Sequence, residues 1–162
     1  MKKFIISIDA GTTSNRSILF DLKGKPIFSS QKEFTQYFPK SGWVEHNPDE
    51  IWKTTIKTLK DVIQKAKRLK GKILSIGITN QRETTVLWDK KTGKPVYRAI
   101  VWQDRRTEEF CKKLRKQNKD TMVFNKTGLL IDSYFSGTKI KWILDNVPKA
   151  RQLMNRKQLL FG

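Results

Sequence analysis

The apolar positions of residues 1–80 change their period once, and this change predicts the order of the first elements. Residues 4–8 form a nearly unbroken apolar run, and its β-branched side chains are typical of a strand that is buried on both faces. Two more strands are predicted over residues 16–20 and 27–34, because short polar turns precede each of them. Three strands joined by such short turns form an antiparallel meander.

The segment that follows the meander has helical spacing. Asn47 is the predicted N-cap, with Pro48 at the first helical position and two acidic residues after it. Lysines alternate with the side chains that we expect to face the core, namely Trp52, Thr55, Leu59, Val62, Ile63 and Ala66. Gly71 is expected to stop the helix, and residues 73–79 return to a buried strand. A helical crossover of this kind adds a strand to the first sheet.

Shorter segments alternate beyond residue 80. Residues 84–89 and 96–102 are predicted to form a small strand pair around a Lys-Thr-Gly-Lys turn. A helix is predicted from Asp104, as its cap, to about Lys116. The apolar spacing thus indicates an inserted pair of strands followed by a helix.

The C-terminal segment adds the last predicted elements. A helix begins near residues 136–137 and is broken by Pro148, after which a short helical segment follows. Residues 158–161 are the last strand candidate. We therefore predict an α/β fold, a single lobe over residues 1–162 that has a mixed five-stranded sheet with flanking helices.

The composition narrows the class of protein. Hydrophobic residues make up 37% of the chain and aromatic residues 10%, which is enough for a packed core. The N-terminal apolar run is interrupted by Asp9 and is too short for a signal peptide or a membrane span. The single cysteine, Cys111, has no partner for an internal disulfide. We therefore expect a cytoplasmic protein with no membrane partner.

The charge of the chain is strongly positive. A net charge of +19 results from 34 basic and 15 acidic residues, an excess that is typical of nucleic-acid-binding proteins. Most of the excess is lysine spaced along predicted helix faces, where a solvated charge needs no ligand. Few arginine and aromatic residues alternate as a base-stacking surface requires. Nucleic-acid binding is therefore the less favoured interpretation.

Residues 9–16 (DAGTTSNR) carry the first candidate site, a small-residue turn after a strand. The glycine lets the backbone approach a ligand closely, and successive N–H groups and hydroxyls can surround phosphate oxygens. Asp9 is placed to hold Mg²⁺, directly or through its waters, and Arg16 to offset charge on the phosphates. The lysine-containing Walker A pattern is absent. These residues alone are equally compatible with a simple hairpin turn.

A polar run that includes Arg82 and Glu83 follows the predicted strand of residues 73–79. Arginine donates a fixed fork of N–H groups and a carboxylate only accepts, so the pair can bind the hydroxyls of a polyol from both sides. An ordinary surface ion pair is the simpler interpretation of an isolated Arg-Glu dipeptide.

Two aromatic residues and the one histidine are further candidates. Trp102 can pack its ring on a small carbon chain, and Tyr134 offers a hydroxyl just before a predicted helix. Each is also compatible with a role in anchoring the core. His46 has no second His or Cys near it that would make a zinc site or a nucleophile–base pair, so we expect it to be structural.

The order of five short motifs is more specific than any one of them. These motifs occupy residues 9–14, 42–48, 77–84, 101–107 and 132–139. In this order they resemble the glycerol kinases of the FGGY carbohydrate kinase family, and the resemblance extends over almost the whole chain. Other kinases of the family share the first motif, whereas the Asn-Gln-Arg-Glu-Thr stretch is characteristic of the glycerol kinases.

The resemblance implies an incomplete actin-like (ribonuclease H-like) ATPase lobe for the phosphorylation of glycerol to sn-glycerol 3-phosphate. ATP and Mg²⁺ are the implied cofactors, and glycerol and ATP or ADP the implied partners. Asp9 is implied to hold Mg²⁺, and the residues implied to contact the nucleotide phosphates are Thr12, Thr13, Ser14 and Arg16. The residues implied to bind glycerol are Arg82, Glu83 and Tyr134, through its hydroxyls, and Trp102, through its carbons.

The length of the chain departs from that pattern. In the glycerol kinases, the aspartate that accepts the proton of the alcohol, the adenosine pocket and the second lobe lie beyond the point that corresponds to Gly162. We therefore expect an amino-terminal fragment that has no catalytic residue of its own and is inactive alone. The alternatives are one half of a split kinase and a non-catalytic glycerol- or phosphate-binding remnant. The expected protein partner is a separately encoded C-terminal lobe or a second copy of the chain in a homo-oligomer.

Overall fold

The computed structural model describes all 162 residues, and they form two compact units. The first unit contains residues 1–36 and 47–81, and the second contains residues 37–46 and 82–162. No helix in either unit has the length and apolarity that crossing a membrane requires.

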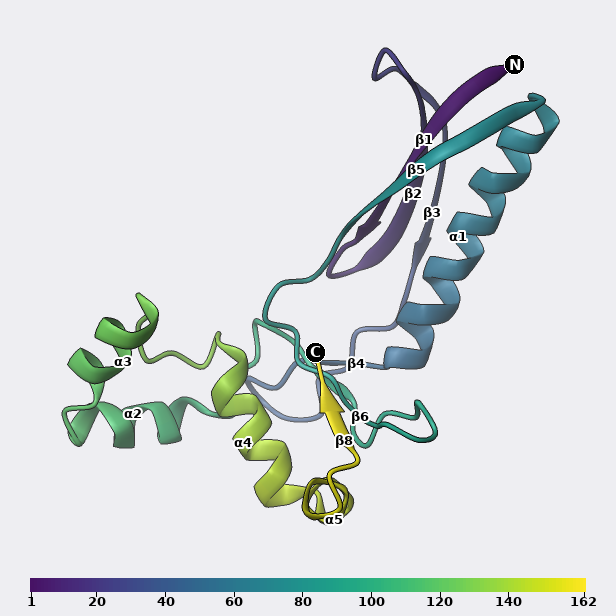
Figure 1. Cartoon of the computed structure of the whole chain (residues 1–162). Coiled ribbons are helices and arrows are strands. Elements are labelled where there is room, and N and C mark those ends of the chain that lie inside the picture. The colour runs from purple at the N-terminus through teal and green to yellow at the C-terminus, as the bar shows by residue number, and fades with distance from the viewer. The chain divides into compact units, whose positions relative to one another are not determined.

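A four-stranded sheet with one helix makes up the first unit, and the meander and crossover predicted from the sequence are confirmed (Figure 1). The strands β1 (Lys2–Ala10), β2 (Ser14–Asp21) and β3 (Pro26–Glu33) are antiparallel neighbours. The helix α1 (Pro48–Arg68) leads to β5 (Gly71–Thr79), which lies parallel to β1. The sheet order is β3-β2-β1-β5.

The prediction of a fifth strand in this sheet is wrong. The last strand, β8 (Leu159–Phe161), pairs instead with β6 (Leu87–Asp89) in the second unit. Three residues provide too little pattern to show which strand they will join, because the period of the side chains is the same in every sheet.

The helix α1 begins where the sequence predicts. The side chain of Asn47 accepts a hydrogen bond from the backbone N–H of Asp49 at 3.0 Å, which is an N-cap. Thr58, Val62 and Ala66 are buried against β2 and β3. Trp52 is 66% exposed, contrary to the prediction, because it lies about 120° around the helix from Thr58.

Gly71 has a packing role rather than the predicted role of stopping α1. The helix already ends at Arg68, and Lys70 makes the turn with a φ of 52°. A Cβ at Gly71 would lie 2.1 Å from Cε2 of Phe4, which is part of the buried core. Only glycine leaves room for the ring of Phe4 over this position of β5.

The sheet is buried less completely than the sequence predicts. Ile6 and Ile8 of β1 are buried under α1, but Ile5 on the other face is 38% exposed. On the edge strand β5, Ile76 and Ile78 lie beside Ile6 and Ile8 yet are 45% and 73% exposed. The helix packs chiefly on β2 and β3, and Ile76 and Ile78 at the edge of the sheet remain exposed on the face that buries Ile6 and Ile8.

The second unit combines short strand pairs with four helices. Its remaining pair joins β4 (Glu45–His46) to β7 (Ala99–Ile100), and its helices are α2 (Glu108–Lys116), α3 (Asp120–Thr127), α4 (Ser136–Asn146) and α5 (Pro148–Asn155). The predicted pairing of residues 84–89 with 96–102 is limited to isolated bridges, and the regular partners are β8 and β4. Leu87, Ile100, Ile143 and Ala150 form its core.

A buried charge cluster fixes the segment before α2. The Arg106 side chain is fully buried, and its Nη2 donates to Glu45 Oε1 at 2.8 Å and to Asp104 Oδ2 at 2.9 Å. The guanidinium carbon also lies 3.8 Å from the ring centre of Trp43. Asp104 is therefore part of this cluster, and the prediction that it caps the helix is wrong, because α2 starts only at Glu108.

Candidate functional site

The first group of predicted residues surrounds the turn between β1 and β2. The N–H of Gly11 donates to the carbonyl of Ser14 at 3.0 Å and closes the turn. A Cβ at Gly11 would lie 3.0 Å from that same carbonyl, so a larger residue would press on the turn. Asp9 and Arg16 are direct partners across the two strands that flank it. The turn thus places a carboxylate and a guanidinium next to the exposed Thr13.

Two glutamines that we did not identify from the sequence support this turn. Gln31 of β3 accepts from Arg16 Nε at 3.1 Å and donates to Ser14 Oγ at 2.8 Å. Gln36 donates through Nε2 to the carbonyl of Thr12 at 3.1 Å. Arg16 and Gln31 are cross-strand partners, so the register of the β2–β3 hairpin was the signal that could have identified Gln31.

Asn15 connects the same turn to the helix. Its buried side chain donates to the carbonyl of Ile51 at 2.9 Å and to Thr54 Oγ1 at 2.6 Å, both in the first turns of α1. These bonds fix the backbone of β2 at Asn15. The side chains of its neighbours, Ser14 and Arg16, point to the opposite face of the strand, so their positions are fixed as well.

The carboxylate oxygens around the turn are too few to bind a magnesium ion unless a ligand supplies further oxygens. No group of three or more His, Cys, Asp or Glu side chains lies close enough to hold a metal. Asp9 is exposed and offers a single carboxylate. Mg²⁺ is commonly held by one or two carboxylates together with water and substrate phosphates, and Asp9 is suited to that kind of site.

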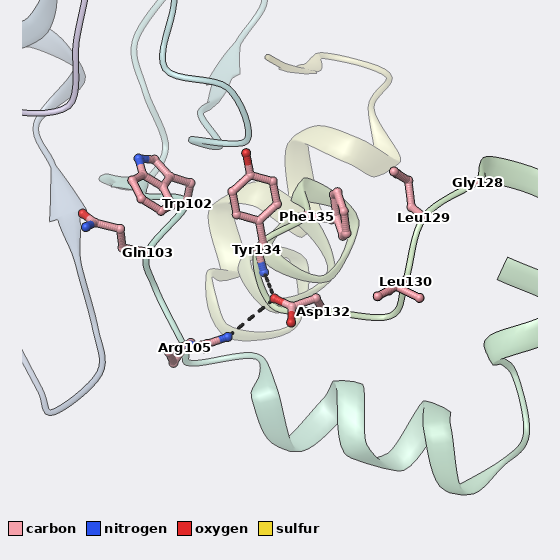
Figure 2. A pocket seen from close by; sticks show the side chains of 9 residues that line it. All are labelled: Trp102, Gln103, Arg105, Gly128, Leu129, Leu130, Asp132, Tyr134 and Phe135. Carbon is pink, nitrogen blue, oxygen red and sulfur yellow. Dashed lines mark hydrogen bonds and ion pairs between the residues drawn. The ribbon is translucent and has the colours of Figure 1, made fainter. Parts of the chain in front are cut away.

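The second group of predicted residues lies in the second unit. The rings of Trp102 and Tyr134 are 6.0 Å apart at an angle of 66°, and both line a cavity of about 670 Å³ (Figure 2). The other residues that line it are Gln103, Arg105, Gly128, Leu129, Leu130, Asp132 and Phe135. The cavity therefore has an aromatic wall and a charged edge, where Arg105 lies 3.5 Å from Asp132.

Glu83 is fixed to the start of α4 from a position 53 residues earlier in the chain. Its Oε2 accepts from the backbone N–H of Ser136 at 2.8 Å and from the Ser136 hydroxyl at 2.7 Å. The residue at the N-cap position of α4, Phe135, has no side-chain acceptor, so the carboxylate of Glu83 caps this helix. Oε1 of Glu83 takes part in neither of these bonds.

The backbone of Glu83 is also held in an uncommon conformation. Its φ is 62°, in the left-handed region that few residues other than glycine adopt. Its carbonyl accepts a hydrogen bond from Nζ of the buried Lys139 at 2.7 Å, and the same Nζ donates to the carbonyl of Tyr134 at 2.5 Å. We did not identify Lys139 from the sequence, where it is one of two lysines on an amphipathic helix.

The structure thus brings together three of the four residues predicted to bind glycerol. Tyr134 contacts Trp102 through its ring and is tied to Glu83 through Lys139. The fourth, Arg82, precedes Glu83 and is exposed. His46 is fully buried on β4, as expected of a structural residue.

Comparison with known proteins gives one consistent result. The model of the FGGY family of carbohydrate kinases, N-terminal domain, matches residues 4–161. The glycerol kinase of Oceanobacillus iheyensis is 58% identical over 161 residues, which are 99% of this chain and 32% of that protein. The glycerol kinase of Bacillus mycoides is 57% identical over 162 residues, which are 100% of this chain and 33% of that protein.

A solved structure agrees with the sequence matches. The crystal structure of Plasmodium falciparum glycerol kinase with ADP superposes with a TM-score of 0.93 at 35% identity, over 99% of this chain and 32% of that one. The chain thus spans about a third of the length of the relatives that it matches. Because the family model covers nearly every residue, the chain belongs to the FGGY family of carbohydrate kinases, within their N-terminal domain.

Proposed function

We propose that this chain supplies the glycerol-binding and phosphate-binding residues of a glycerol kinase, an enzyme that uses ATP to phosphorylate glycerol to sn-glycerol 3-phosphate. The observation that carries the proposal is its identity of 57–58% with glycerol kinases over essentially the whole chain. The grouping of Glu83, Tyr134 and Trp102 around the start of α4 supports it.

The glycerol site would combine acceptors, donors and an apolar wall. Oε1 of Glu83 and the hydroxyl of Tyr134 would accept from glycerol hydroxyls, and the guanidinium of Arg82 would donate to them. The ring of Trp102, which is 36% exposed, would pack against the carbons. A small polyol has a hydroxyl on every carbon, so it needs this mixture of polar partners on its edges and an apolar surface beneath it.

The phosphate site would lie at the turn in the first unit. Thr12, Thr13 and Ser14 would bind the phosphate oxygens through hydroxyl and N–H groups, and Arg16 would offset their charge. Mg²⁺, when bound by Asp9 and by phosphate oxygens, would neutralise charge that develops during transfer. Gln31, which bonds to the side chains of both Ser14 and Arg16, keeps these two residues in place before the ligand arrives.

The transfer step would also need a carboxylate that accepts the proton of the alcohol. We assign no residue of this chain to that role, since Glu83 is committed to glycerol and to the cap of α4. We propose that a second lobe supplies it, either joined to this chain or separately encoded. A cytoplasmic location follows from the proposed use of ATP.

The proposal is tested by binding and by turnover in parallel. Glycerol is titrated into ¹⁵N-labelled chain while the five indole N–H signals are followed by NMR, and ADP with Mg²⁺ is titrated separately. We expect glycerol to shift the Trp102 signal, and W102F identifies that signal. Y134F should weaken glycerol binding about tenfold because it removes one hydrogen-bonding hydroxyl, and Y37F is the matched control in the same unit.

Three outcomes decide the matter. Saturable glycerol binding that Y134F weakens, without formation of glycerol 3-phosphate from ATP, supports a binding lobe that needs a second one. Product formation by the chain alone would show that one of its own residues is the base and would overturn the assignment of that role elsewhere. A chain that binds xylulose or gluconate but not glycerol would refute the proposed substrate.

A further inference from the structure

We propose that Lys139 is a positioning residue of the glycerol site, because its ammonium joins the backbone carbonyls of Glu83 and Tyr134 and so fixes the two side chains relative to each other. This inference rests on the proposed function of those two residues as glycerol ligands. Lys139 itself lies beneath them and touches no part of the cavity that Trp102 and Tyr134 line.

The position of Lys139 is unusual for a charged side chain. It is the fourth residue of α4, it is 0% exposed, and Ile143, one turn further along the same face, belongs to the apolar core. No carboxylate lies within ion-pair distance of its ammonium among the salt bridges of the chain. Its partners are instead two neutral carbonyls, at 2.7 Å and 2.5 Å.

A buried ammonium without an ion-pair partner is disfavoured, because it loses hydration that carbonyls replace only in part. Burial lowers the pKa of Lys139 to about 8, although the charges of Glu83, Asp104 and Asp132 act in the opposite direction. An aliphatic side chain of the same length would fill this place without that cost. Packing alone therefore does not explain why this residue is charged. The two backbone carbonyls that accept from its ammonium indicate that the charge holds them together.

Both carbonyls belong to residues whose side chains point to the proposed ligand. Glu83 has the left-handed backbone described above, and the bond from Lys139 holds it there while Ser136 holds the carboxylate. Tyr134 is the second residue before Ser136, and its carbonyl is fixed by the same ammonium. Nζ also lies 5.9 Å from the centre of the Tyr134 ring. One lysine thus couples the two ligands through their main chains and leaves their polar atoms available.

The test compares K139M with K141M in the full chain of 162 residues. Lys141 lies on the same helix, its side chain is 50% exposed, and its ion pair with Asp145 lies outside the glycerol site. Glycerol and Mg-ADP are titrated into each variant by NMR, as for the unmodified chain. We expect K139M to raise the dissociation constant of glycerol at least about tenfold, with no change for Mg-ADP, and K141M to change neither. Equal glycerol affinity in K139M and the unmodified chain would overturn the proposal.

A pH series separates positioning from a merely structural role. In the unmodified chain, glycerol affinity should decline as the pH rises from about 7 to 9.5, because Lys139 loses the charge that holds the two carbonyls. The decline should be missing in K139M and present in K141M. Affinity that is independent of pH in all three proteins would refute a role for the charge.

A second measurement does not depend on glycerol. If the chain binds no glycerol, the proposed function of the isolated chain fails, but Lys139 is still tested by hydrogen exchange of the Ser136 amide, which donates to Glu83. K139M should speed that exchange about tenfold relative to the Val101 amide, which bonds to Val44. Unchanged protection of Ser136 in a folded K139M would show that Lys139 does not position Glu83.

Discussion

Replacement of Arg106 by Met should destabilise the second unit more than any exposed charge substitution. The Arg106 side chain is 0% exposed, and those of its partners Glu45 and Asp104 are 3% and 1% exposed. The guanidinium donates to both oxygens of Asp104, at 2.9 Å each, and to one oxygen of Glu45. Methionine would fill much of the space on the ring of Trp43. It would leave Asp104 buried without its cation, and Glu45 with only the half-exposed Arg98 at 3.7 Å.

The magnitude follows from that burial. Removal of one partner of a buried ion pair costs about 3–5 kcal/mol, because the remaining charge is desolvated and uncompensated. The cost is reduced here to the extent that Tyr97 and Val44 still donate to Glu45 and Asp104, at 2.7 Å each. We therefore expect about 3 kcal/mol, which is a large part of the 5–15 kcal/mol that usually stabilises a domain.

The assay is urea denaturation followed by tryptophan fluorescence, since Trp43 and Trp142 both lie against the Arg106 guanidinium. R105M is the matched control, because the Arg105 side chain is 62% exposed and its ion pair with Asp132 is long, so it should cost under about 1 kcal/mol. R106K keeps the positive charge but loses the planar set of N–H donors. Its loss of unfolding free energy should therefore lie between those of R106M and R105M. An R106M chain no less stable than R105M would show that the charges are not desolvated in solution.

Three further predictions concern the packing at Gly71, the exposed apolar surface at Ile78 and the buried charge of Lys139. G71A should cost about 1–3 kcal/mol in urea because its Cβ meets the ring of Phe4, whereas G77A in the same strand, with nothing within 4 Å, should cost far less. I78T should reduce the binding of an apolar fluorescent dye with little loss of stability, since Ile78 is 73% exposed; unchanged dye binding would contradict this. In the folded chain the pKa of Lys139 is lowered to about 8, so this side chain loses its proton above pH 8. In the unfolded chain it stays protonated to a higher pH. The unfolding free energy relative to K139M should therefore rise by roughly 2 kcal/mol between about pH 7.5 and 10, and a flat difference would contradict the lowered pKa.

Local chemistry made part of the fold predictable. Asn47 and Pro48 indicate the start of α1 without any tertiary information, because a cap and a fixed φ act within one turn. The length of the crossover and the short turns then restrict the sheet to few arrangements. By contrast, Ile76 and Ile78 have the same sequence pattern as the buried Ile6 and Ile8. Their exposure depends on the position of β5 at the edge of the sheet, which the pattern does not reveal.

The two arginines of residues 105 and 106 show why much of the second unit was not predictable. They are identical in type and adjacent in sequence, yet one side chain is 62% exposed and the other fully buried. The difference comes from Glu45 and Trp43, which are about 60 residues away in the chain and leave no local signal. For the same reason the sequence predicts Asp104 to be a helix cap, a role that short polar residues before a helix usually have.

The residues of the candidate site fall into two classes that differ in how visible they are in the sequence. Those that face a ligand, such as Thr12 and Glu83, lie in motifs that a family resemblance identifies. Two of those that hold them, Gln36 and Lys139, donate to the main-chain carbonyls of the ligand residues, and the presence of Lys139 in the motif of residues 132–139 does not reveal this role. A carbonyl has no sequence identity, so a residue that binds one imposes no pattern on its partner. Support of this kind leaves the side chains of the ligand residues free for their ligands, and because it imposes no sequence pattern it is seen only in the folded structure.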